Sequence, residues 1–125
     1  MASLVLVDGP DRKKYLPLKG GILVVGRDEA LPMQILDERV SRKHLRLRFD
    51  EDQKQYLARD MGSRSGTYIN HAKLEGEEEI ALQDRDRIVV GGTTLVFMDR
   101  DFPNIESALS ESKKAGERGR MTNFE

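Results

Sequence analysis

The sequence predicts an all-β fold, an antiparallel sandwich of short strands. Short apolar runs rich in β-branched side chains alternate with turn residues at intervals of roughly 8–12 residues. No stretch before residue 100 has the apolar spacing of a helix. The clearest alternation lies in residues 44–49, where both leucines and the phenylalanine are expected to face the core. The histidine and both arginines of that stretch are expected to face outward.

The expected strands follow one another closely along the chain. The second contains Pro17, which restricts it to a sheet edge or a strand end. Turn signals such as Gly20-Gly21 and Gly91-Gly92 separate neighbouring runs. In chain order, the ten strands expected from this pattern cover residues 4–7, 15–18, 22–25, 33–36, 44–49, 55–60, 67–70, 80–82, 87–90 and 93–98.

The composition of the chain changes after Phe102. We expect one domain over residues 1–101 and a C-terminal tail or linker over residues 102–125, which suits a chain of 125 residues. Asn104 is placed to cap a short helix over residues 104–117, although this segment has too few large apolar residues to pack firmly. The tail is therefore predicted to be partly helical or disordered.

The overall composition excludes several classes of function. The chain has no cysteine, which rules out disulfides, thiolate metal sites and a cysteine nucleophile. No apolar run approaches the ~20 residues that span a bilayer, and the N-terminus lacks the pattern of a signal peptide. We expect a cytoplasmic monomer that needs no cofactor and no metal, since His44 and His71 give no metal-ligand spacing.

Charge is unevenly distributed on a chain whose net charge is only -1. Residues 39–48 contain five basic and no acidic side chains, whereas four of the five residues from Glu75 to Glu79 are acidic. A local basic patch on a nearly neutral protein favours a short anionic ligand over a nucleic acid or a membrane. The acidic run is expected to be a solvated loop, and its pairing with the basic stretch is left open.

Three polar segments interrupt the apolar runs, and they are Gly26-Arg27, Ser41-Arg42-Lys43-His44 and the loop from Gly62 to Thr67. A guanidinium offers paired donors in the geometry of a phosphate. Serine hydroxyls and backbone N–H groups can donate to the same anion. The three segments are therefore predicted to be loops that a rigid sheet framework presents to an anionic ligand.

This ordered set of segments, followed by Asn70, strongly resembles the forkhead-associated (FHA) family. The family pattern is Gly-Arg, Ser-x-x-His, Gly-Ser-x-Asn-Gly-Thr and an Asn three residues after that Thr, and the resemblance covers roughly residues 4–99. It implies a β-sandwich of about eleven strands that is not an enzyme. It further implies a signalling module that binds phosphothreonine peptides through loops at one end of the sandwich. The threonine of such peptides is phosphorylated by a Ser/Thr kinase.

The resemblance also implies roles for individual residues. Phosphopeptide binding falls to residues in all three segments, namely Arg27, Ser41, Arg42, Ser63, Arg64 and Ser65. Support of the binding loops falls to Gly26, His44, Gly66, Thr67 and Asn70. Ser65 is the main departure, because the family usually has an asparagine there that bonds to the peptide backbone. His71 also departs from the family, which commonly has a glycine after the matching asparagine.

Alternative interpretations accompany these assignments. Taken singly, the serines also fit ordinary turns and the arginines ordinary solvated side chains. The change at Ser65 supports a second function, a phosphate-independent docking domain on the same fold. A hydrolase that uses Ser41 and His44 lacks a recognisable carboxylate to orient the imidazole. Thr122 is a possible regulatory phosphosite that, once phosphorylated, could occupy the domain's own binding site.

Overall fold

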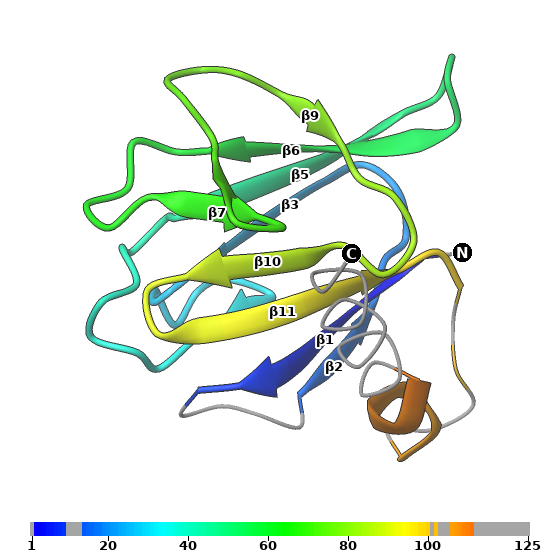
Figure 1. Ribbon diagram of the computed structural model, residues 1–125, viewed down its shortest axis with the longest axis horizontal. Coiled ribbons are helices and arrows are strands. Elements are labelled where there is room, and N and C mark those ends of the chain that lie inside the picture. Colours follow the sequence, from blue (N-terminus) through cyan, green and yellow to red (C-terminus); the bar gives the residue numbers. More distant parts are fainter. Residues whose placement is uncertain (1, 10–13, 101, 103–105, 112–125) are drawn as a thin grey trace, which may run out of the picture.

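The described residues of the computed structural model, 2–9, 14–100, 102 and 106–111, form eleven strands in two sheets (Figure 1). The predicted antiparallel β-sandwich of about eleven strands is therefore confirmed. The strands are β1 (Ser3–Asp8), β2 (Tyr15–Pro17), β3 (Ile22–Gly26), β4 (Met33–Gln34), β5 (Leu45–Asp50), β6 (Gln55–Asp60), β7 (Thr67–Ile69), β8 (Ala72–Lys73), β9 (Ile80–Ala81), β10 (Arg87–Val90) and β11 (Thr93–Met98). Two-residue β8 is additional to the pattern expected from the sequence.

The strands divide between a six-stranded sheet and a five-stranded sheet. The six-stranded sheet has the order β2-β1-β11-β10-β7-β8, and Pro17 ends its edge strand as predicted. The five-stranded sheet has the order β4-β3-β5-β6-β9. All pairs between the described strands are antiparallel except β3 with β4, which run parallel. The connections at one end of the two sheets carry the polar segments singled out above.

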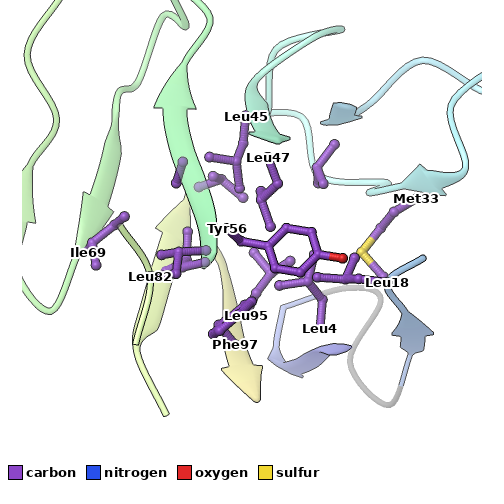
Figure 2. Packing of buried hydrophobic residues seen from close by; sticks show 14 of the residues in the cluster. Leu4, Leu18, Met33, Leu45, Leu47, Tyr56, Ile69, Leu82, Leu95 and Phe97 are labelled. Atoms are coloured by element: carbon purple, nitrogen blue, oxygen red, sulfur yellow. The ribbon is translucent and has the colours of Figure 1, made fainter. Parts of the chain in front are cut away.

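The hydrophobic core lies between the two sheets and is built from alternate residues of the strands (Figure 2). Leu45 and Leu47 of β5 are fully buried, as the alternation predicts. Tyr56 of β6 packs against Phe97 of β11 with ring centroids 5.8 Å apart, so this pair joins the two sheets. Close packing of this kind makes the framework rigid enough to hold loops in fixed positions.

His44 is a correction to the alternation. It was expected to face outward with Arg46 and Arg48, but it is fully buried. Strand β5 begins only at Leu45, so the face of His44 is not set by the strand period. Instead its ring lies between two loops, where both nitrogens have hydrogen-bond partners.

The acidic run 75–79 is largely exposed, as expected of a solvated loop, and the pairing that the sequence left open is observed. Glu79 accepts hydrogen bonds from Nε of Arg48 (2.7 Å) and from Nη2 of Arg46 (3.2 Å). Glu77 lies 3.3 Å from a guanidinium nitrogen of Arg59. The acidic run therefore does pair with basic residues, along the outer face of the five-stranded sheet.

The described part of the C-terminal segment packs on the outer face of the six-stranded sheet (orange in Figure 1). Residues 106–111 are helical, and Ala108 is fully buried against Val5, Val96 and Met98. The short helix therefore buries an alanine side chain on the outer face of the sheet. The other residues of the predicted helix 104–117, and Thr122, lie outside the described residues. No helix in the described part of the chain has the length and apolarity needed to cross a membrane.

Candidate functional site

The three polar segments lie together at one end of the sandwich, on the left in Figure 1. They occupy the β3–β4, β4–β5 and β6–β7 connections. The backbone N–H of Arg27 donates to the carbonyl of Ser41 (3.0 Å), and the N–H of Arg64 donates to Ser41 Oγ (3.1 Å). Ser41 is thus the point where the three loops meet.

Gly26 allows the first two loops to approach each other. A Cβ at this position would collide with the carbonyl oxygen of Arg42 and would lie 2.9 Å from that of Ser41. Arg27 follows with an exposed side chain whose Nε donates to the carbonyl of Val40 (3.1 Å). This bond orients the guanidinium, and its two Nη groups donate to no described residue.

His44 joins the second loop to the third. Its Nδ1 accepts the backbone N–H of Ser41 (3.0 Å), so Nε2 carries the proton and donates to the carbonyl of Gly66 (2.8 Å). Asp60 does lie near the ring, but its carboxylate is 3.9 Å from Nε2. Both ring nitrogens are therefore occupied, and neither is left to take a proton from Ser41 Oγ as a hydrolase requires.

Asp60 is a residue that the sequence analysis missed. Its buried carboxylate accepts hydrogen bonds from the Ser63 backbone (2.9 Å), the Ser63 hydroxyl and Thr67 Oγ1 (2.7 Å). Burial raises the pKa of Asp60, but the hydrogen bonds from Ser63 and Thr67 outweigh it and the net pKa lies below its ordinary value. The available signal was its place on the core face of β6 with Tyr56 and Ala58.

Asp37 is a second missed carboxylate, and it fixes the loop that carries Ser41. It is buried and accepts the backbone N–H groups of Arg39 (2.9 Å) and Gly92 (2.8 Å), as well as Thr93 Oγ1 (3.0 Å). Burial raises its pKa, but these bonds outweigh it and hold the pKa below its usual range. Two of the partners are more than fifty residues away, so no local pattern could have identified them.

The third loop is closed by its serines. Ser63 Oγ accepts the N–H of Gly66 (2.9 Å), and Gly66 has a positive φ of 83°, which favours glycine. Ser65 Oγ donates to the carbonyl of Arg39 (2.7 Å). The hydroxyl that departs from the family pattern is therefore used to tie the third loop to the second.

The remaining predicted residues divide into exposed and framework positions. Arg42 and Arg64 have exposed side chains beside Ser41, and Arg42 lines a cavity of about 500 Å³ together with Arg27. Thr67 is buried against Asp60. Asn70 lies farther away, in the β7–β8 turn, where its Oδ1 accepts the N–H of Arg87 (3.0 Å). Asn70 and His71 both have positive φ angles, so the turn forms without a glycine at position 71.

Comparisons with known proteins agree with this architecture. A sequence profile of the FHA domain matches residues 23–91. An FHA domain-containing protein of Arabidopsis thaliana is 32% identical over 123 residues, which covers 94% of this chain and 31% of that protein. The solution structure of the FHA domain of an Arabidopsis thaliana hypothetical protein has a TM-score of 0.75 and 32% identity, covering 82% of this chain and 88% of that one.

A further similar structure comes from a study of phosphothreonine-dependent FHA domain interactions. It has a TM-score of 0.69 and 29% identity, and the match covers 81% of this chain and 98% of that one. A β-sandwich whose three polar loops are hydrogen-bonded together at one end is typical of a domain that carries a binding site on its loops. The profile matches more than half of the 125 residues, and the chain belongs to the FHA domain family.

Proposed function

We propose that the chain is a phosphothreonine-dependent protein-interaction module that binds peptides phosphorylated by a Ser/Thr kinase. The observation that carries the proposal is the convergence of three loops on Ser41, with the exposed side chains of Arg27, Arg42 and Arg64 around it. Family membership and the similar structure from phosphothreonine-dependent interactions support the same ligand. Binding of this kind requires no catalytic step and no cofactor.

The phosphate is held by preformed donors. Ser41 Oγ accepts the N–H of Arg64, which leaves its own hydroxyl proton for a phosphate oxygen. Arg27 is oriented by its bond to Val40, so little side-chain freedom is lost when its Nη groups bind the anion. Arg42 and Arg64 add charge that favours the dianion, because charge-assisted hydrogen bonds are the stronger ones.

The second candidate function is a docking domain that does not require phosphate. The observation in its favour is Ser65, whose hydroxyl donates to Arg39 rather than standing free for a peptide backbone. In the phosphate-dependent proposal, the peptide backbone beside the phosphothreonine is bound by the exposed loop backbone. In the docking proposal, Ser41 and the arginines contribute little to capture of the partner.

Calorimetric titration with a phosphothreonine peptide and its unphosphorylated twin separates the two functions. We expect affinity to rise at least about a hundredfold with the phosphate, since several charge-assisted bonds form. Ser41→Ala combined with Arg42→Ala should remove most of that gain. Lys19→Ala, which removes an exposed charge before β3, at the other end of that strand, is the control and should leave the gain intact. Equal affinities for the two peptides would overturn the proposal and leave the docking function.

A further inference from the structure

A cavity extends beside the proposed phosphate site. Its volume is about 500 Å³, and it is lined by residues of the β3–β4 and β4–β5 loops, namely Arg27, Asp28, Glu29, Gln34, Leu36, Glu38 and Arg42. Two of these residues, Arg27 and Arg42, belong to the proposed phosphate site. A peptide whose phosphothreonine is bound by these arginines therefore has a neighbouring side chain within reach of the cavity.

We infer that this cavity binds a lysine or arginine side chain of the phosphopeptide, an inference that rests on the proposed function. Beyond the two arginines, the charged residues of the cavity are all acidic. Glu29 and Glu38 are exposed and form no ion pair within the described part of the chain. An incoming cation thus gains carboxylate partners without displacing an existing one.

The cavity also has an apolar surface that suits a long side chain. Leu36 is 59% exposed, which is unusual for a large aliphatic residue in this domain. Lysine and arginine have aliphatic stems that cover apolar surface while the charged head remains near water and acceptors. Gln34 donates from Nε2 to the carbonyl of Arg27 (3.1 Å), which ties one wall of the cavity to the β3–β4 loop that carries Arg27.

Other occupants fit less well. Once the phosphothreonine occupies Arg27 and Arg42, an acidic side chain or a second phosphate group would be repelled by the three remaining charged residues, which are carboxylates. A metal ion requires several ligands gathered around one point, and among the described residues no three acidic or histidine side chains are grouped closely enough to hold one. Carboxylates spread around an apolar side chain match an extended organic cation better than a compact ion.

The test uses a set of phosphothreonine peptides in which a single lysine is moved through each position around the phosphothreonine. Norleucine, which keeps the aliphatic stem and lacks the charge, replaces that lysine in the reference peptides. We expect one lysine position to bind about fivefold more tightly than its norleucine twin, the size of an exposed but ordered ion pair. Glu29→Gln with Glu38→Gln should abolish this ratio. The matched control is Glu51→Gln with Asp52→Asn in the β5–β6 turn, which removes the same charge elsewhere and should preserve it.

The outcomes separate this inference from the function on which it rests. If no peptide binds in a phosphate-dependent manner, the proposed function and this inference both fail. If the norleucine phosphopeptide binds and no lysine position improves on it, only the cavity assignment is overturned. A lysine preference that survives Glu29→Gln with Glu38→Gln would also overturn the assignment, because the cation then binds elsewhere.

Discussion

Two groups of polar residues on or beside β5 and β6 are used in opposite ways. At the loop end of these strands, His44 and Asp60 are buried and hydrogen-bonded to the loops. On the outer face of the same sheet, the side chains of Arg48 and Glu79 pair while remaining 37% and 24% exposed. The first group fixes the geometry of the candidate site, and the second covers a sheet face.

The two groups differ in their exposure to water. A buried donor or acceptor that loses its partner retains its full desolvation cost, so every bond of the loop-end network is required. An exposed ion pair that is broken is replaced by water and by salt, so its net contribution is small. Polar residues of the two groups should therefore differ several-fold in their effect on the free energy of unfolding.

The largest effect is expected for Asp60→Ala. This change leaves the Ser63 N–H, the Ser63 hydroxyl and Thr67 Oγ1 without their acceptor. The free energy of unfolding should fall by about 3 kcal/mol, measured by urea denaturation. Asp52→Ala, at an exposed position of the β5–β6 turn, is the matched control and should change it by less than about 0.5 kcal/mol. A similar small loss for both variants would contradict the contrast between the two groups.

Acid should weaken the loop-end network next. The pKa values of Asp37 and Asp60 are lowered in the folded state, so their stabilisation is fully present above the unfolded pKa of about 3.9 and is lost as pH falls through the folded values. Between pH 7 and pH 3 we expect the free energy of unfolding to fall as these two carboxylates begin to be protonated. The measurement is the urea midpoint at each pH. Asp37→Asn with Asp60→Asn should have a flatter pH dependence, and an unchanged slope would assign the acid sensitivity to other groups.

The fold was largely predictable from the sequence because local signals determine it. The apolar alternation of β5 and the proline at the end of β2 correctly placed core residues and an edge strand. The polar segments of the candidate site were correctly predicted to be loops, because glycines, serines and arginines between apolar runs form a local pattern. Local order thus identified the loops and the framework together.

The connections between the loops were not predictable in the same way. Asp37 binds Gly92 and Thr93, and Ser65 binds Arg39 across 26 residues, so these contacts exist only after the sheets have formed. The side chain of His44 was wrongly predicted to face outward, because the alternation of β5 was extended to a residue that precedes the strand. The pairing of Glu79 with β5 was left open by the sequence, because it depends on how the chain returns along the five-stranded sheet.

Ser65 is intermediate between the two groups, because its side chain is exposed but its hydroxyl joins two loops. Ser65→Ala therefore tests whether exposure alone makes such a bond weak. Loss of its hydrogen bond to the Arg39 carbonyl should lower the free energy of unfolding by about 0.5–1 kcal/mol. Urea denaturation provides the measurement. Arg64→Ala, the exposed neighbour whose side chain bonds to no described residue, is the comparison and should cost less. Equal losses of stability for the two variants would show that the Ser65 hydrogen bond does not stabilise the fold.

The smallest effect is expected for Glu79→Gln on the outer face. The hydrogen bond from Arg48 holds the pKa of Glu79 below its ordinary value, so the pair is charged at neutral pH. Because both side chains are partly exposed, the loss of stability should stay under about 1 kcal/mol and shrink as salt is added. Urea denaturation of the wild type and the variant at low and high salt gives both quantities. A loss of stability as large as that of Asp60→Ala, or one that salt does not reduce, would contradict the contrast. The ion pair of Arg48 and Glu79 would then contribute as much to stability as the buried hydrogen bonds do.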